Sequence, residues 1–427
     1  MTKFSKTRLP FIFNFVIVFS YRTVVNMTKT EIISAAFRVW GRDFYRKTSL
    51  SHLAHDLGVS KPALYRHFLS KQALTNAMTE QFLDAFAAAI SSDFKKALQA
   101  ADPDEGIYII IKSIAGFFAR NVYALLFSLV NIYDRNLDGR TISDHLKNRG
   151  ADINTFSRVI EKKYKTNPVV IKLIFATLTF YMANFHKINN TFDKPPSEEK
   201  IQSIISTIYR VVEHGLGFTV ENTAALNFEK LEVMVDGTIQ RTEHEPLVRA
   251  VAEVVAEAGP WDASMDMVAR RMGLSKSSLY GHFKNKKDML RRLFLSEFAR
   301  IIGFARQGIR LSQNPAEQLY LGIYSIAVYL RSHPQILVAL DWIRTRKLDL
   351  GEPDKDPEIL RLFEDVELES LRNSTQEEKQ HTSHWILFLL INTLTRFNLS
   401  EIEKVKNNDM RVLYKFITLG AGGFKRL

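Results

Sequence analysis

Cysteine is absent from this chain of 427 residues, and proline and glycine are scarce, with 12 and 19 residues. Without cysteine the chain has no disulfides, no thiolate metal sites and no thiol catalysis. So few turn-forming residues favour long helices over a turn-rich β architecture. No low-complexity tract is present, and a composition with 46% hydrophobic and 24% charged residues is typical of a soluble globular protein. The length predicts two or more domains. The cytoplasm, which is reducing, is the expected location.

The chain is basic, with a net charge of +12 and a pI near 9.5, which points towards a polyanionic partner. The charge is unevenly placed. Residues 27–75 hold eight Lys and Arg against three Asp and Glu, a balance of +5, whereas residues 241–291 hold nine against seven, a balance of +2. The first of these regions is therefore the more strongly basic.

The N-terminal segment needs a separate interpretation. Three basic residues precede an apolar run at 10–21, a pattern that resembles a signal peptide. No small-x-small cleavage site follows, and the run is too short to span a bilayer as a helix. Met27 is a natural beginning for the first helix. We expect residues 1–26 to be a non-native or disordered leader outside the fold, with a short membrane-associating leader as the alternative, and no transmembrane span downstream.

One stretch occurs twice: "GVSKPALYRHF" at 58–68 and "GLSKSSLYGHF" at 273–283, 215 positions apart without a gap. Over residues 49–74 and 264–289, ten of 26 positions are identical. A match on this scale indicates an internal duplication. The predicted domains are 27–75, 76–217, 244–290 and 291–427, with a linker at 218–243.

Apolar residues at helical spacing predict an all-α protein. In each half, a first helix (30–41 in the first half), two short helices (50–57 and 61–68) and a long helix from Lys71 are expected, and the same layout recurs at 245–300. Longer helices follow, predicted at 107–133, 169–188, 198–214, 318–332, 334–346, 355–372, 383–397 and 400–419. Each half is thus a three-helix unit followed by a helical domain.

Two short helices joined by a glycine turn describe a helix-turn-helix, which places its second helix in the DNA major groove. Gly58 and Gly273 suit the left-handed conformation of such a turn. The leucine and phenylalanine of each copy are expected to fix the recognition helix to the core. These side chains are Leu64, Phe68, Leu279 and Phe283.

The segments "AAFRVWGRDFYRKTSLSHLAHDLGVSKPALYRHFLSKQAL" and "AVAEVVAEAGPWDASMDMVARRMGLSKSSLYGHFKNKKDML" both resemble the N-terminal DNA-binding domain of TetR-type transcriptional regulators. The signature is Leu/Val-Ala-x-x-x-Gly-Val/Leu-Ser-x-x-x-Leu-Tyr-x-His-Phe-x-x-Lys, and the resemblance covers about 45 residues in each half. The rest is similar in being helical and of suitable length for a regulatory domain. An ordinary member of that family has one such unit and dimerises, so two units in one chain depart from its plan.

The resemblance implies that matched positions contact DNA. The tyrosines would touch phosphate or a thymine methyl group, the histidines and the fourth-helix lysines would donate to phosphate, and backbone N–H groups near the serines would hold another phosphate. Arg66 would read guanine, which Gly281 has no side chain to do. The predicted DNA-binding residues are Ser49, Lys61, Pro62, Ala63, Tyr65, Arg66, His67, Lys71, Ser264, Lys276, Ser277, Ser278, Tyr280, His282 and Lys286.

These observations predict a sequence-specific DNA-binding transcriptional regulator, a ligand-responsive repressor that reads half-sites of double-stranded DNA with two non-identical recognition helices. A small-molecule effector is the candidate further partner. Either the halves pair within one chain through helices at 169–214 and 383–419, as a pseudo-dimer, or two chains form a homodimer. The alternatives are a membrane-associated one-component DNA-binding sensor and an all-helical enzyme, for which no catalytic motif is found.

No cofactor or metal is expected. His52 and His55 lie three residues apart, but no carboxylate or cysteine cluster accompanies them. "GAGG" at 420–423 is followed by four residues only, so no helix remains for a dinucleotide-binding fingerprint to open.

Overall fold

A computed structural model describes residues 27–42, 49–132, 142–164, 169–192, 194–238, 245–346, 374–395 and 407–424, together with positions 362, 363, 366, 368 and 372. Every regular element within these ranges is a helix, which confirms the all-α prediction. The predicted leader, and most of the helix predicted at 355–372, lie outside the described residues.

The first half contains α1 (Lys29–Arg42), α2 (Leu50–Asp56), α3 (Lys61–His67), α4 (Lys71–Gln99), α5 (Pro103–Arg120), α6 (Val122–Phe127), the π-helical turn η1 (Ser128–Ile132), α7 (Ile142–Lys147), α8 (Ile153–Tyr164), α9 (Val169–Asn189) and α10 (Glu198–His214). Two further helices, α11 (Val220–Ala224) and α12 (Phe228–Thr238), lead into the second half. That half contains α13 (Pro246–Asp262), α14 (Met265–Met272), α15 (Lys276–His282), α16 (Lys286–Ile309), α17 (Pro315–Ser332), α18 (Pro334–Arg346), α19 (Gln376–Leu394) and α20 (Asn407–Gly423).

The helix predicted at 107–133 is broken in the structure. Its two parts, α5 and α6, meet at Asn121 and are bent by 103°. Asn121 leaves the helical conformation (φ −134°, ψ 67°), and its side-chain amide donates to the Phe117 carbonyl over 2.8 Å. His333 adopts almost the same backbone angles (φ −133°, ψ 64°) between α17 and α18. There the following Pro334 disfavours a helical residue before it. The internal duplication therefore extends beyond the repeated stretch.

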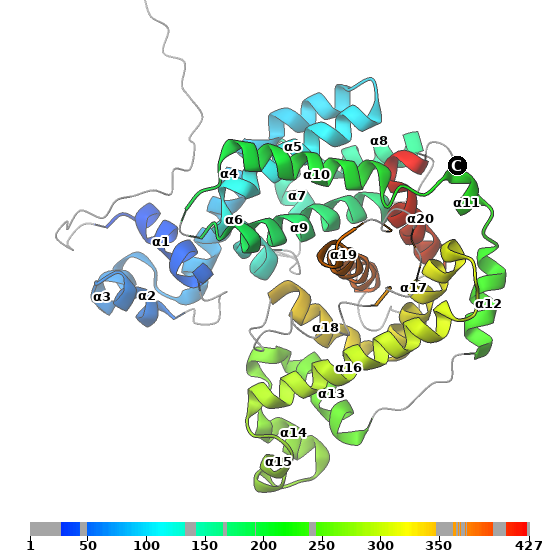
Figure 1. Cartoon of the computed structure of the whole chain (residues 1–427). Helices are drawn as coiled ribbons and strands as arrows, with labels where there is room; N and C mark the ends of the chain where they lie inside the picture. The colour runs from blue at the N-terminus through cyan, green and yellow to red at the C-terminus, as the bar shows by residue number, and fades with distance from the viewer. Residues whose placement is uncertain are drawn as a thin grey trace, which may run out of the picture.

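The two halves meet through four helices at the centre of the molecule. Here α10 packs along α20, and α9 packs against both α19 and α20. The indole nitrogen of Trp385 donates to the hydroxyl of Thr177 over 3.1 Å in this interior. Figure 1 shows α9, α10, α19 and α20 together, with α1–α3 and α13–α15 as two separate outlying parts. Among the described helices, α9 alone is long and apolar enough to cross a membrane, but 67% of its most apolar stretch is buried.

The two halves approach each other closely where α10 and α20 end. Gly215 and Gly420 both have positive φ, 56° and 66°. A side chain on Gly215 would place its Cβ 2.5 Å from the carbonyl oxygen of Ile417 and 2.6 Å from the nitrogen of Gly420. The backbone N–H of Leu216 donates to that same Ile417 carbonyl over 2.8 Å. Gly420, the first glycine of "GAGG", thus serves close packing between backbones.

The predicted linker is structured between residues 218 and 238. It forms α11 and α12, and α12 packs on α17. The asparagines and Gly237 suggest interruptions in this segment, but Phe228, Leu231 and Val235 lie on one face of α12. Leu231 and Val235 are buried, and Phe228 packs against the core. This apolar face holds α12 against the second half because burial of an amphipathic face outweighs local propensity.

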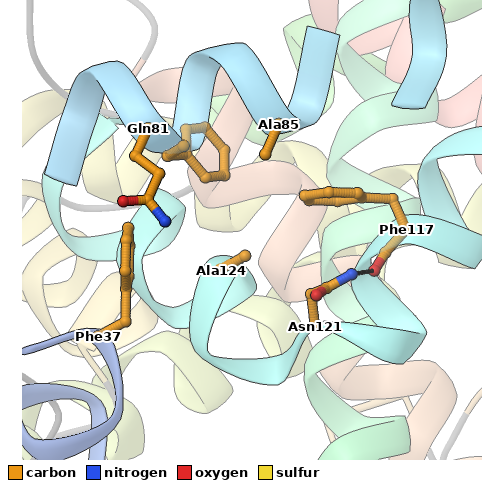
Figure 2. Close-up of a pocket in the computed structure, with 7 residues that line it drawn as sticks. Phe37, Gln81, Ala85, Phe117, Asn121 and Ala124 are labelled. Atoms are coloured by element: carbon orange, nitrogen blue, oxygen red, sulfur yellow. Dashed lines mark hydrogen bonds between the residues drawn. The ribbon is translucent and has the colours of Figure 1, made fainter. Parts of the chain in front are cut away.

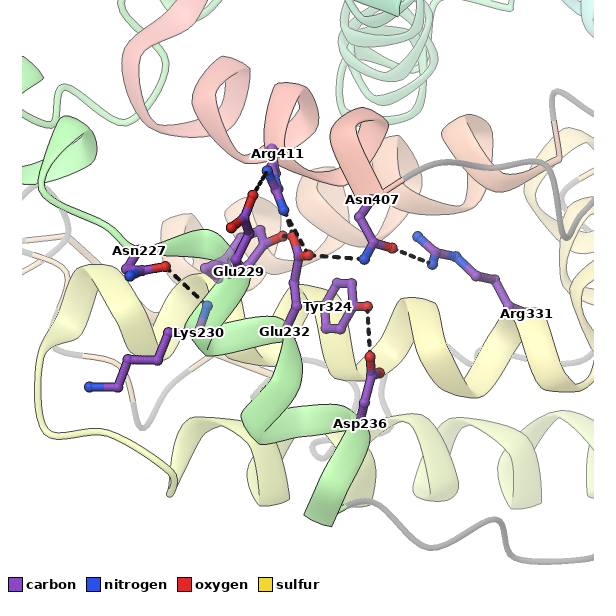
Figure 3. A network of polar contacts seen from close by, with 10 residues as sticks. Asn227, Glu229, Lys230, Glu232, Asp236, Tyr324, Arg331, Asn407 and Arg411 are labelled. Atoms are coloured by element: carbon purple, nitrogen blue, oxygen red, sulfur yellow. Dashed lines mark hydrogen bonds and ion pairs between the residues drawn. The ribbon is translucent and has the colours of Figure 1, made fainter.

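Glu232, near the middle of α12, bonds this helix to the second half (Figure 3). Its carboxylate accepts hydrogen bonds from Arg411 on α20 (2.8 and 2.9 Å), from the hydroxyl of Tyr320 (2.6 Å) and from Asn407 (2.9 Å). Burial by itself would raise the pKa of Glu232, but the hydrogen bonds, first that of Arg411, outweigh burial and lower it. The segment that joins the halves is therefore held by an ion pair whose carboxylate is buried.

Candidate nucleic-acid interface

The first helix-turn-helix unit, which we call head 1, consists of α1, α2, α3 and the first turn of α4. Ser49 caps α2 by accepting from the backbone N–H of His52 over 3.0 Å, and Ser60 caps α3 by accepting from that of Ala63 over 3.4 Å. Gly58 between them has φ +64°, while a Cβ there would have no neighbour within 4 Å. Glycine is needed at this turn for its backbone conformation rather than for space.

The α3 helix has a buried and an exposed side. Leu64 and Phe68 are 1% and 5% exposed, so they hold the helix on the core. Tyr65 on the other side is 45% exposed although it is aromatic. Lys61 and Arg66 are also exposed, and neither makes an ion pair with any residue that the structure describes. The side chains on this face are available to an external partner.

The second unit, head 2, repeats this construction with α13, α14, α15 and the first turn of α16. Ser264 caps α14 by accepting from Met267 N over 3.3 Å, and Ser275 caps α15 by accepting from Ser278 N over 3.1 Å. Gly273 is left-handed, with φ 66° and ψ 23°. Leu279 and Phe283 are buried, whereas Tyr280 is 48% exposed. Both units therefore present an α-helix with an exposed tyrosine in the same position.

The structure places the predicted contact residues on the outside of both heads. Exposed positions are Ser49, Lys61, Pro62, Tyr65, Arg66 and Lys71 in head 1, and Lys276, Ser277, Ser278, Tyr280 and His282 in head 2. Half-buried positions are Ala63, His67, Ser264 and Lys286. Their contact with DNA stays a prediction.

The two heads differ in charge. The ammonium of Lys276 pairs with both carboxylate oxygens of Asp266, at 3.0 and 3.1 Å, and this hydrogen bond raises the pKa of Lys276. Lys286 is half-buried, and desolvation lowers its pKa against the opposing effect of Asp262. Lys71, its counterpart in head 1, is exposed. At these two pairs of matched positions, the lysines of head 2 are therefore less accessible to an external anion than those of head 1.

Asp266 and Leu69 are surface features that the sequence patterns did not single out. Leu69, directly after α3, is 85% exposed and has Lys284 as its counterpart in head 2. Asp266 occupies the position of Ser51 in head 1. Because the two repeats align without a gap, the sequence alone pairs Leu69 with Lys284 and Ser51 with Asp266.

The histidines of α2 are close to a single carboxylate. His52 Nε2 lies 3.8 Å from Asp56 Oδ1, and His55 Nδ1 lies 3.3 Å from the same oxygen. Within the described ranges, no group of three or more metal-binding side chains is found. The chemistry visible on this helix is thus that of an exposed polar surface.

A small pocket lies where head 1 meets the helices behind it (Figure 2). Its lining comes from α1, α4, α5 and α6: Phe37, Gln81, Phe82, Ala85, Phe117, Asn121 and Ala124. The space within is about 20 Å³, which holds about one water molecule. Nearby, a Cβ on Gly41 would lie 2.7 Å from the ring of Tyr123, so α6 is seated directly on the end of α1.

Two capped, glycine-joined helix pairs with exposed recognition helices define a DNA-binding protein of the helix-turn-helix class. A family model for bacterial regulatory proteins of the tetR family matches this chain twice, at residues 32–78 and 247–293. The chain therefore carries two helix-turn-helix DNA-binding domains of the tetR type in tandem. It is also similar to the fatty acid metabolism regulator protein of Bacillus subtilis (strain 168), with 27% identity over 123 residues. That alignment covers 29% of this chain and 62% of the relative.

Proposed function

We propose that this protein is a cytoplasmic repressor in which one chain binds one operator. Its two heads take the places that the two subunits of a dimer take in an ordinary regulator. Two recognition helices must lie roughly 34 Å apart to enter successive major grooves on one side of DNA. In this chain the spacing is set by the packing of α9 and α10 on α19 and α20.

The observation that carries this proposal is the closure of the four-helix interface within a single chain. Buried groups from both halves meet there, including the pair formed by Trp385 and Thr177. The crossing of Gly215 and Gly420 leaves no room for a side chain at either position. Helices α9 and α10 pack on α19 and α20 within one chain, so a single chain contains the equivalent of both subunits of a dimer.

We propose further that the two half-sites of the operator differ in sequence. Arg66 is exposed on α3 of head 1, and Gly281 stands at the same position on α15. An arginine can donate two hydrogen bonds to guanine O6 and N7, whereas glycine offers no side chain. Ser277 and Ser278 replace Pro62 and Ala63, and their hydroxyls bond to Ser275 in the free protein.

Selection of bound duplexes from a random pool, followed by footprinting, tests this function. The wild-type chain should enrich a two-part site with unequal halves. The Arg66→Ala variant should lose about 1–3 kcal/mol of binding free energy. The loss should arise at one half-site of the operator only. An equal loss on selected and unrelated duplexes would show that Arg66 touches only phosphate.

The direction of regulation is a separate test. We propose repression under the control of an effector. A shift of the regulatory helices would reach head 1 through the contact of α6 with α1. The selected operator, placed ahead of a reporter gene, should give lower transcription when the chain is expressed. A rise in reporter transcription would identify an activator instead.

A further inference from the structure

We propose that Asp266 weakens the hold of head 2 on DNA by occupying Lys276, so that head 1 binds DNA more strongly than head 2. This inference rests on the proposed DNA-binding function. Its basis is the ion pair between the first residue of α15 and the second residue of α14, 3.0 Å long and exposed to solvent on both sides.

Head 1 provides the internal comparison. Lys61 occupies the position of Lys276, but Ser51 occupies the position of Asp266. No carboxylate of the described residues lies within 4 Å of Lys61. The same lysine is thus available to a phosphate in head 1 and is engaged by a carboxylate in head 2.

A second difference acts in the same direction. In head 2, Arg271 is held by Glu253 at 2.9 Å and by Glu257 at 2.5 Å. Positions 38 and 42, which correspond to the two glutamates, are arginines in head 1. The first helix of head 2 therefore brings negative charge where the first helix of head 1 brings positive charge. Both differences make head 2 less attractive to a phosphate backbone.

Asp266 has two effects on bound DNA. Its carboxylate repels phosphates directly, and it competes with them for the Lys276 ammonium. Each additional phosphate that a protein neutralises changes the slope of log K against log salt by about −0.9. Removal of one repulsive charge, together with release of one cation, corresponds to roughly a 3- to 10-fold increase in affinity at low salt.

The experiment is a titration of the selected operator with full-length Asp266→Ser, which gives head 2 the residue of head 1. We expect binding to tighten roughly 3- to 10-fold, a salt slope steeper by about one, and stronger protection of the second half-site. Glu221→Ser removes one exposed carboxylate from α11, which lies apart from both heads (Figure 1), and should leave binding unchanged. The reverse change, Ser51→Asp, should weaken binding through head 1.

The double variant Asp266→Ser with Lys276→Ala separates the two effects. If the double variant loses most of the increase in affinity, release of Lys276 is supported, and an undiminished increase overturns that part of the proposal. Unchanged or weaker binding by folded Asp266→Ser, while wild type binds its operator, overturns the inference as a whole. If wild type binds no duplex selectively, the proposed function itself has failed.

Discussion

Replacement of Gly420 by alanine should open the contact between the two halves. Gly420 has φ 66° and ψ −175°, a conformation that only glycine adopts readily, and a side chain there costs about 1–3 kcal/mol. The new Cβ would also lie 2.5 Å from the backbone nitrogen of His214, and closer still to the Glu213 carbonyl. Because backbone atoms cannot rotate away, overpacking adds about 1–3 kcal/mol. The sum, about 2–6 kcal/mol, is a large share of the stability of a typical domain, about 5–15 kcal/mol.

Urea unfolding, followed by circular dichroism and by tryptophan fluorescence, measures this loss. Gly217→Ala is the matched control, since Gly217 has φ +73° but nothing within 4 Å of a Cβ. The control should lose only about 1–2 kcal/mol from backbone strain. Gly420→Ala should lose more, and should also bind the operator less tightly. Equal losses in the two variants would refute the close approach between α10 and α20.

Two further predictions concern buried charged groups. Glu232→Ala should lower the free energy of unfolding by about 3 kcal/mol, because it leaves Arg411 and the buried Tyr320 hydroxyl without their main partner. A loss below about 1 kcal/mol in urea unfolding would contradict this role of the ion pair. Burial, and then the charges of His381 and Lys187, lower the pKa of His384 to about 4. Since the unfolded chain binds the proton more tightly, stability present above about pH 6.5 should fall by roughly 3 kcal/mol as pH drops to about 4, and His384→Gln should flatten this dependence.

The repeated stretch predicted the heads well because it combines local signals. Serine caps, a glycine turn and buried leucine and phenylalanine are all fixed by nearby residues, so the helices at 50–57 and 61–68 agree with α2 and α3 within one residue. The bend at Asn121 was missed, because the apolar run continues through it and no proline marks it. In the second half, Pro334 does mark the equivalent bend.

Features that depend on distant residues were not predictable from local patterns. Glu232 lies in a segment interrupted by asparagine and glycine, and its partner Arg411 is 179 residues away. The requirement for glycine at position 420 appears only where α20 meets α10. Asp266 lies within a predicted unit, but its pairing with Lys276 needs the turn of head 2 to bring α14 and α15 together.

The most direct test of the account is the number of chains on one operator. Light scattering coupled to size exclusion gives the mass of the complex between the full chain and a duplex that carries one selected site. Pairing of the two heads within one chain predicts one chain of 49.1 kDa per duplex, with both half-sites protected in the footprint. Two chains per duplex, each protecting one half-site, would contradict the pairing of the two heads within a single chain.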